Sequence, residues 1–277
     1  MKAISGLFIC LTLSVSAFAK NNPNYEDCRF SCKGIPSEED SLLSFGAAKM
    51  PTLPEGKIKI LAWNLYKGEK KYFSEQFPIV SKGRDIILLS EVVTGAPVEP
   101  AMTKIADFGW NFGASFEMKN QVLTGTAVGS NVVALNPHIY RTKLVEPIIK
   151  TPKTITAAEF ALPGTRDTLL VLSIHGINMA GDDALISQLE PLVPELKSHL
   201  GPIVFAGDFN TKNPTRLKMA TDLLATAGLR RVTWENAKPG KQLDDAFTRG
   251  LKVRAKFIFD YVGTASDHPA IALEVTP

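Results

Sequence analysis

Several features that would assign this chain to a special class of protein are scarce or missing. The 277 residues include only 3 cysteines, and we find no internal repeat and no low-complexity block. The 31 Lys and Arg nearly balance the 28 Asp and Glu, so the net charge is +3. This balance excludes a generally polybasic protein, and any polyanion would have to bind a local patch. A Gly-rich dinucleotide-binding loop is also missing, whereas 45% apolar and 21% charged residues suit an ordinary globular protein.

The amino-terminal stretch MKAISGLFICLTLSVSAFAK has the pattern of a secretory signal peptide. Lys2 supplies a positive start, residues 4–15 are apolar, and residues 17–19 form a small-x-small cleavage motif. The apolar run is too short for a comfortable membrane span, and Cys10 lacks the small residue that would precede it in a lipoprotein. We predict that residues 1–19 are removed, that the protein is exported to the periplasm or secreted, and that no stable membrane anchor remains.

Export changes the interpretation of the two cysteines that stay in the mature chain. Cys28 and Cys32 form the motif C-R-F-S-C. An even pair in an oxidising compartment favours a small disulfide loop. A metal site would need further ligands nearby, and none is evident. Two free thiols are the remaining alternative, because a bridge needs specific geometry.

The rest of the chain divides into an extension and one domain. Residues 20–54 are polar and turn-rich, so we expect an N-terminal extension there and a domain over residues 55–277. Asp182 or Asp183 could begin a helix near 184–199, shortened or kinked by prolines, and Asn213 with Pro214 begins a second helix that Gly228 ends. The expected strands are KIKILAW, DIILLS, TAVGSNVVAL, TLLVLSI, GPIVFAG, AKFIFDYV and AIALEV. Strands with interspersed helices favour a mixed, layered α/β (α+β) domain.

Polar groups occur where these apolar runs end. The stretch VFAGDFNTKNP carries Asp208 and Asn210 directly after a strand, and taken alone it is typical of a turn. Four other runs also have metal-binding or proton-transferring groups at one end: Asn64, Glu91, His175, and Asp267 with His268. Burying such groups separately costs several kcal/mol unless they are paired or bound to an ion. Each has a structural alternative, a solvated strand end or a core histidine, but together they predict an active site at one edge of a sheet.

These motifs, in this order, resemble the endonuclease/exonuclease/phosphatase (DNase I-like) superfamily. The resemblance rests on W-N at 63–64, S-E at 90–91, S-I-H at 173–175, G-D-F-N at 207–210 and S-D-H at 266–268, and it spans about residues 57–277. It implies a four-layered sandwich of two packed mixed β-sheets flanked by helices. It also implies phosphoester cleavage that depends on a divalent metal, Mg²⁺ with Mn²⁺ as a substitute.

The resemblance assigns roles residue by residue. Glu91 resembles the main metal ligand, with Asn64 beside it and Asp267 as a further carboxylate near the metal. Asp208 and Asn210 resemble the pair that positions the attacking water and holds the phosphoryl group. The catalytic histidines are His268 at the scissile phosphate, oriented by Asp244, and His175, which donates to a phosphate oxygen or the leaving group. Asp245 follows Asp244, so either acid could be the partner of His268, and register favours Asp244.

The substrate is less well defined by the sequence. Asn64, Asn210 and Lys67 are expected to bind substrate, and Arg254 lies in LKVRAK, whose basic residues share one face of an extended strand. Such a row could follow a nucleic-acid backbone, or it could be a solvated edge strand. We therefore expect a monomeric nuclease that acts on nucleic acid. The alternatives are a sphingomyelinase-like lipid or inositol phosphoesterase, a toxin-subunit-like nuclease, and a non-catalytic binding protein on the same scaffold.

Overall fold

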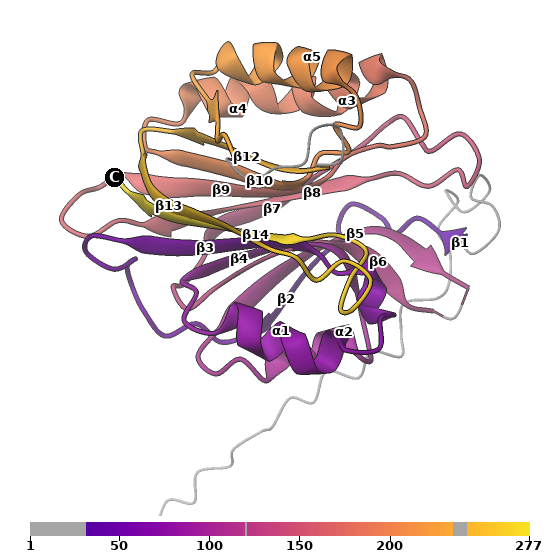
Figure 1. The fold of residues 1–277 in the computed structure, drawn as a ribbon, viewed down its shortest axis with the longest axis horizontal. Coiled ribbons are helices and arrows are strands. Elements are labelled where there is room, and N and C mark those ends of the chain that lie inside the picture. The colour runs from indigo at the N-terminus through magenta and orange to yellow at the C-terminus, as the bar shows by residue number, and fades with distance from the viewer. Residues whose placement is uncertain (1–31, 120, 235–242) are drawn as a thin grey trace, which may run out of the picture.

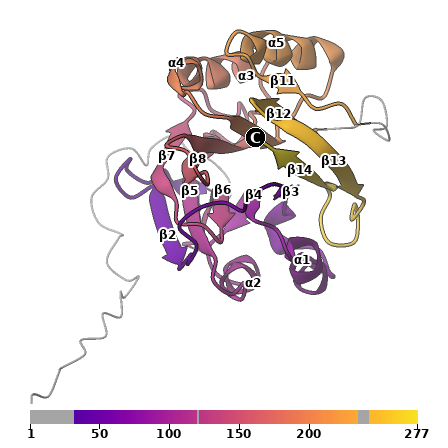
Figure 2. The same cartoon turned by 90° about the vertical axis from the view of Figure 1, so that its left-hand side faces the viewer.

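The computed structural model describes residues 32–119, 121–234 and 243–277. Two β-sheets pack face to face, and helices cover both outer faces (Figure 1). The view turned by 90° shows the same four layers from the side (Figure 2). The predicted fold class, an α/β four-layered sandwich of two mixed sheets flanked by helices, is confirmed. Among the described residues, no helix combines the length and apolar character needed to cross a membrane.

The first sheet has eight strands in the order β1-β5-β6-β4-β3-β14-β13, with β2 also pairing with β5. Only β3 and β4 run parallel within the described sheet, and the other pairs are antiparallel. The strands are β1 (Cys32–Gly34), β2 (Leu42–Gly46), β3 (Ile58–Asn64), β4 (Ile86–Val93), β5 (Gly109–Met118), β6 (Leu123–Ser130), β13 (Lys252–Phe259) and β14 (Ala270–Thr276).

The second sheet has six strands in the order β11-β12-β10-β9-β8-β7, and it too contains one parallel pair, β9 with β10. The strands are β7 (Leu135–Arg141), β8 (Thr154–Ala161), β9 (Thr168–His175), β10 (Ile203–Asp208), β11 (Arg230–Arg231) and β12 (Asp244–Arg249). Strands β3 and β4 contact β10 and β9 across the sandwich, so the two parallel pairs face each other.

Helices cover the outer faces. The first sheet is covered by α1 (Phe73–Ser81) and α2 (Val98–Thr103), and a 3₁₀ turn, η3 (Tyr66–Gly68), follows β3. The second sheet is covered by α3 (Asp182–Leu189), the 3₁₀ turn η4 (Glu190–Leu192), α4 (Val193–Ser198) and α5 (Pro214–Ala225).

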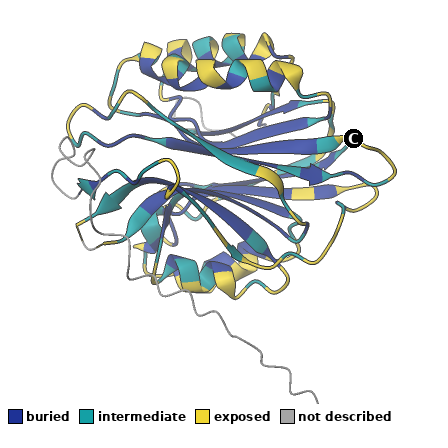
Figure 3. Ribbon diagram, turned by 180° about the vertical axis from the view of Figure 1, so that it is seen from behind, coloured by how far each residue is buried: buried dark blue, intermediate teal, exposed yellow. Residues whose placement is uncertain are grey.

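The hydrophobic core consists of three clusters, one for each interface between layers. The central cluster joins the inner faces of the two sheets through residues such as Ile60, Val128 and Val171. A second cluster packs α1 and α2 on the first sheet, around Trp63 and Phe77. The third packs α3 to α5 on the second sheet. Figure 3 shows that the strands are buried along much of their length while the outer sides of the helices are exposed. Because each sheet is packed on both of its faces, the ends of its strands are held in fixed positions.

The predicted helices occur with the expected interruptions. The segment expected as one helix near 184–199 is divided into α3, η4 and α4, since Pro191 and Pro194 cannot donate backbone hydrogen bonds. Asn213 caps α5, its side chain accepting the N–H of Arg216 at 2.8 Å. Gly228 follows α5 with φ 79°, a conformation that glycine adopts readily.

Other elements differ from the sequence-based expectation. The run TAVGSNVVAL is not one strand, because β6 ends at Ser130 and β7 begins at Leu135. Helix α1 was not predicted; it contains Pro78 and buries Phe73 and Phe77. Strands β5, β8 and β12 were also missed. Their small and polar residues, such as those of TITAAEFA in β8, carry little of the apolar pattern of a strand.

The segment expected as an N-terminal extension packs with the domain over its described part, residues 32–54. Strands β1 and β2 pair with β5, and Leu53 is buried in the central cluster. Strand β2 pairs with β5 alone among the described strands, and its burial is partial. Cys32 is disulfide-bonded, while its predicted partner Cys28 lies outside the described residues, as does the predicted signal peptide over residues 1–19.

Candidate active site

The predicted site residues of four strands meet where the two parallel pairs end. Asn64 ends β3, His175 ends β9 and Asp208 ends β10. The Asn64 side chain donates from Nδ2 to Asp208 Oδ2 at 2.9 Å, a buried hydrogen bond that joins the two sheets. Glu91 lies near the end of β4, one residue beyond Ser90, the register partner of Asn64. The carboxyl ends of both parallel pairs therefore form one rim.

The backbone around this rim adopts conformations that ordinary residues avoid. Glu91 has φ 50° at an irregularity in the pairing of β4 with β6, and Asn210 has φ 51°. Gly207 has φ 139°, and a Cβ atom there would lie 2.6 Å from the carbonyl oxygen of Ile174. Left-handed conformations cost about 1–3 kcal/mol each and persist where surrounding structure enforces them. They turn the Glu91 and Asn210 side chains into the rim.

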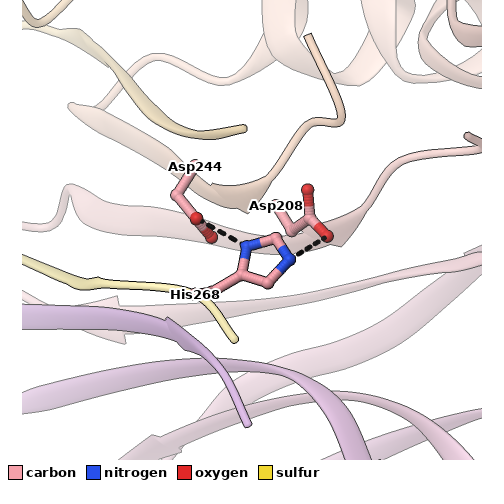
Figure 4. A group of neighbouring side chains, drawn as sticks. All are labelled: Asp208, Asp244 and His268. Carbon is pink, nitrogen blue, oxygen red and sulfur yellow. Dashed lines mark hydrogen bonds and ion pairs between the residues drawn. The ribbon is translucent and has the colours of Figure 1, made fainter. Parts of the chain in front are cut away.

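A chain of three side chains lies at the centre of the site (Figure 4). His268 Nδ1 is hydrogen-bonded to Asp244 Oδ2 at 2.7 Å, and His268 Nε2 lies 3.8 Å from Asp208 Oδ2. Asp244 comes from β12, and His268 from the segment before β14. The Ser266 hydroxyl fixes this segment, since it donates to the Asn64 carbonyl at 2.6 Å and accepts the His268 N–H at 3.1 Å.

The charges of these three side chains shift the pKa values of His268 and Asp208. Burial lowers the pKa of His268, but the carboxylates of Asp244 and Asp208 outweigh burial and raise it to about 10. Burial raises the pKa of Asp208 to about 7, against the lowering effect of His268. His268 is therefore a charged donor near neutral pH, whereas Asp208 is poised to gain or lose a proton.

The neighbouring acid, Asp245, has a different partner. Successive residues of a strand point to opposite faces, and Asp245 Oδ2 accepts a 2.8 Å hydrogen bond from Arg231 Nε. Both acids are buried. His268 contacts Asp244, the acid that the register favours.

Asn210 supports Asp208 directly. Its backbone N–H donates to Asp208 Oδ1 at 2.9 Å, and its side-chain Nδ2 donates to the Gly176 carbonyl at 2.8 Å. Gly176 is needed there, because a Cβ atom would lie 2.5 Å from the Phe209 carbonyl oxygen. The G-D-F-N motif thus forms a wall of the site, and its acid is held in one orientation by backbone and side-chain donors.

Glu91 forms the other side of the rim with Lys67. Lys67, in η3, has φ 53° and places its ammonium 2.6 Å from Glu91 Oε2. Burial would raise the pKa of Glu91, but nearby cations, Lys67 among them, hold it at about 2. Glu91 is therefore ionised throughout the physiological range, and Lys67 lies within the predicted site.

His175 has surroundings opposite to those of His268. Its Nε2 lies 3.0 Å from the ammonium of Lys153 and 3.6 Å from Asp208 Oδ2. Burial and the Lys153 charge lower the pKa of His175 well below its ordinary value. Lys153 itself is paired with the buried Glu146, whose Oε1 lies 3.7 Å from Nζ. Lys153 and Glu146 were missed from the sequence, because neither follows an apolar run and both occur in a turn-rich stretch.

Two predicted site residues stand apart. Asp267 is exposed between Ser266 and His268, near the rim but with its side chain open to solvent. Arg254 lies away from the other predicted site residues: it bonds Thr276 at the far end of β14, whereas those residues lie before Ala270, which pairs with Phe259. Strand rise of about 3.3 Å per residue separates Arg254 from that end of β13 by about 16 Å.

A family model described as Endonuclease/Exonuclease/phosphatase family matches residues 61–268. This range includes all the predicted site residues from Asn64 to His268. The chain belongs to this family. The resemblance of the sequence motifs to the superfamily is thereby confirmed.

Members of the family and proteins of the same fold span different sources. A UPF0294 protein of Klebsiella pneumoniae is 29% identical over 237 residues, which cover 83% of this chain and 86% of that protein. The human nocturnin catalytic domain, solved with bound sulfate, has a TM-score of 0.62 at 15% identity, covering 81% of this chain and 95% of that one. The endonuclease domain of TRAS1, a telomere-specific retrotransposon, has a TM-score of 0.53 at 12% identity, covering 79% and 98%.

The family generally uses a divalent metal, and the residues at Glu91 fit one. Mg²⁺ takes hard oxygen ligands, one or two carboxylates suffice, and it keeps several waters. Glu91 offers an ionised carboxylate one residue beyond the register partner of Asn64, whose amide oxygen accepts the Tyr66 N–H. The ammonium of Lys67 on Glu91 shows that this position attracts a cation.

A second group of possible ligands is the triad of Asp208, Asp244 and His268, whose ligand atoms lie within 4.8 Å of one another. Two of those atoms already form the Asp244–His268 hydrogen bond. That bond suits a group that holds a proton better than a metal ligand set. Glu91 with Asn64 is accordingly the better candidate for the metal of this family member.

Proposed function

We propose that this protein is a divalent-metal-dependent phosphodiesterase, and that it acts as an endonuclease on nucleic-acid phosphodiester bonds. The family membership supports hydrolysis of a phosphoester. The observation that carries the proposal is the buried chain Asp244–His268–Asp208, which offers a charged donor and a carboxylate of raised pKa side by side. We further propose that the mature protein is a monomer that works after export, in the periplasm or outside the cell.

In the proposed reaction, water attacks phosphorus, the bond from phosphorus to the leaving oxygen breaks, and that oxygen leaves with the bonding pair and takes a proton from solvent. Asp208 accepts the proton of the attacking water, held in place by Asn210 and Asn64. His268 donates a hydrogen bond from Nε2 to a phosphoryl oxygen, and Asp244 holds its ring orientation through Nδ1. A divalent metal at Glu91 supplies Lewis-acid charge to the phosphoryl oxygens when bound. Fixed donors of this type contribute about 2.7–4 kcal/mol each to lowering a barrier.

Three observations support nucleic acid as the substrate. Lys67 gives the rim a cation that can meet a backbone phosphate next to the scissile one. Lys70 lies over the Tyr66 ring at 4.7 Å from its centroid, which places a second cation on the same loop. The endonuclease domain of TRAS1 shares the fold.

The test is nicking of supercoiled plasmid by residues 20–277 with Mg²⁺, with Mn²⁺ in parallel, beside the matched variants Asp208→Asn and Asp245→Asn. We expect the wild-type protein to nick the plasmid and a chelator to abolish this activity. We expect Asp208→Asn to lose the activity and Asp245→Asn to retain it. Nicking that resists the chelator, or that Asp208→Asn leaves unchanged, would refute the metal or the base.

A lipid or inositol phosphoester is the second candidate, favoured by exposed apolar side chains near the site. Leu144, Ile148 and Met179 are 48%, 58% and 45% exposed. Their loops meet the site through Glu146, which accepts the N–H groups of Asn178 and Met179. Metal-dependent cleavage of phospholipid in vesicles, without plasmid nicking, would establish this alternative.

A further inference from the structure

A buried lysine lies against His175 in the site. The side chain of Lys153 is 12% exposed, and its Nζ lies 3.0 Å from His175 Nε2 and 3.7 Å from Glu146 Oε1. An ammonium taken out of water costs several kcal/mol unless partners compensate. A lysine serving only as surface charge would extend into solvent, as this one does not.

Glu146 fixes the ammonium in this position. The Glu146 side chain is 1% exposed, and its two oxygens accept the N–H groups of Asn178 and Met179 at 2.7 Å each. These backbone groups belong to the loop that follows His175 at the end of β9. These two hydrogen bonds hold the carboxylate in place. Glu146 therefore ties the loop that carries Lys153 to the loop that follows His175.

The direction of the hydrogen bond between Lys153 and His175 depends on the form that Lys153 takes. Burial lowers the pKa of Lys153, while the carboxylates of Glu146, Glu91 and Asp208 oppose that effect. In the ammonium form that these carboxylates favour, Lys153 has three donors and no acceptor, so His175 Nε2 accepts. The Nε2 edge also faces Asp208 at 3.6 Å and Glu91 at 3.9 Å. An ammonium at Lys153 therefore places donors next to this edge of the site.

We propose that Lys153 is a further catalytic residue, which donates from its ammonium to a phosphate oxygen of the substrate and balances the charge that grows there as water attacks. Glu146 is its positioning residue. His175 then orients the ammonium by accepting one of its hydrogens, in place of donating to the phosphate itself. This inference rests on the proposed phosphodiesterase function and adds a residue to it.

The alternative is that Lys153 only balances the charge of Glu146, which joins this loop to the loop after His175, and charge-balanced variants separate the two roles. We would measure kcat and KM on plasmid and on bis(p-nitrophenyl) phosphate at saturating Mg²⁺, for Lys153→Met, Lys153→Arg and the double variant Lys153→Met with Glu146→Gln. The double variant removes both charges, so no unpaired carboxylate remains in the interior. Melting temperature and the circular dichroism spectrum show which variants fold.

The catalytic role predicts that kcat falls about 10²–10³-fold in Lys153→Met, and that the folded double variant is equally slow. Lys153→Arg, which keeps the charge, should regain about tenfold, and KM should change less than kcat. A double variant that regains wild-type kcat would overturn the proposal, because a joining role needs only charge balance. A Lys153→Met variant with unchanged kcat would overturn it directly.

A separate readout covers the case in which the wild-type protein cleaves no phosphodiester tested, an outcome that counts against the proposed function alone. Inorganic phosphate is then titrated into the wild-type protein and the double variant, and binding is followed by calorimetry. Phosphate binding that is at least tenfold weaker in the double variant supports Lys153 as a phosphate-binding residue. Equal binding by both proteins overturns that role.

Discussion

The two histidines of the site are the same side chain in opposite surroundings. His268 lies between Asp244 and Asp208, and their charges raise its pKa to about 10. His175 lies against Lys153, and burial with that positive charge lowers its pKa well below the ordinary value. Near neutral pH one ring is a charged donor and the other a neutral acceptor. The comparison teaches that the partner of a histidine, not its distance from the reacting atoms, decides what it can do.

The largest expected effect separates the two rings. His268→Ala removes the charged donor at the centre of the site, and we expect kcat to fall at least about 10³-fold. His175→Ala removes only the acceptor that orients Lys153, so the loss should be nearer tenfold. Steady-state kinetics of both purified variants on the same substrate checks this. Equal losses would break the contrast between the rings.

The next effect removes the cause of the raised pKa. Asp244→Asn keeps the shape but deletes the charge beside His268, so kcat should fall about 10²-fold and the pKa of His268 should drop. NMR titration of the ring, following its Cε1 proton, measures the shift. A raised histidine pKa stabilises the folded state below the unfolded value of about 6.5, and this stabilisation is lost as pH rises through about 10. The stability cost of Asp244→Asn should therefore be larger at pH 6 than above pH 10.

Asp245 provides a neighbouring control with a smaller effect. Asp245→Asn touches Arg231 and not His268, so we expect kcat within about twofold of wild type. Burial raises the pKa of Asp245 to about 6 despite Arg231. The stabilisation that follows is present below the unfolded value of about 3.9 and is lost as pH rises through about 6. Denaturant unfolding between pH 4 and pH 7 should show a shallower pH dependence in the variant; a kcat loss matching Asp244→Asn would reassign the partner of His268.

The smallest effect is expected at Arg254. Because the structure places it at the far end of β13, Arg254→Ala should leave kcat and KM within about twofold of wild type on short substrates. Kinetics on a dinucleotide-sized phosphodiester checks this, with Lys67→Ala as the matched loss of a cation at the rim. A tenfold rise in KM for Arg254→Ala alone would restore it to the substrate-binding residues.

The sequence was informative where strand ends carry the chemistry. Asn64, His175 and Asp208 could be predicted together because each directly follows an apolar run, and the fold then brings the carboxyl ends of β3, β9 and β10 to one rim. Lys153 and Glu146 could not be predicted in this way. Both lie in the loop between β7 and β8, and the contact of Lys153 with His175 depends on how this loop meets the end of β9, which no periodicity in the sequence records.

Arg254 illustrates the opposite limit. Its spacing within LKVRAK placed it correctly on a strand, but a local pattern contains no information on which end of that strand faces the site. Strand direction follows from the pairing of β13 with β14, a long-range property. The same holds for α1, where burial of Phe73 and Phe77 against the sheet overrides the cost of Pro78 inside the helix.

The place of β14 in the first sheet determines when this site can exist. β14 lies between β3 and β13, and His268 is on the segment that enters it. A growing chain emerges from the ribosome amino end first, so Asn64, Glu91 and Asp208 are all made before the residue on which they depend. Any chain interrupted before residue 268 lacks both the histidine and the strand that fills the gap beside β3. Under the proposed function an unfinished copy would therefore be inert, and activity would mark only those molecules whose synthesis and folding have been completed.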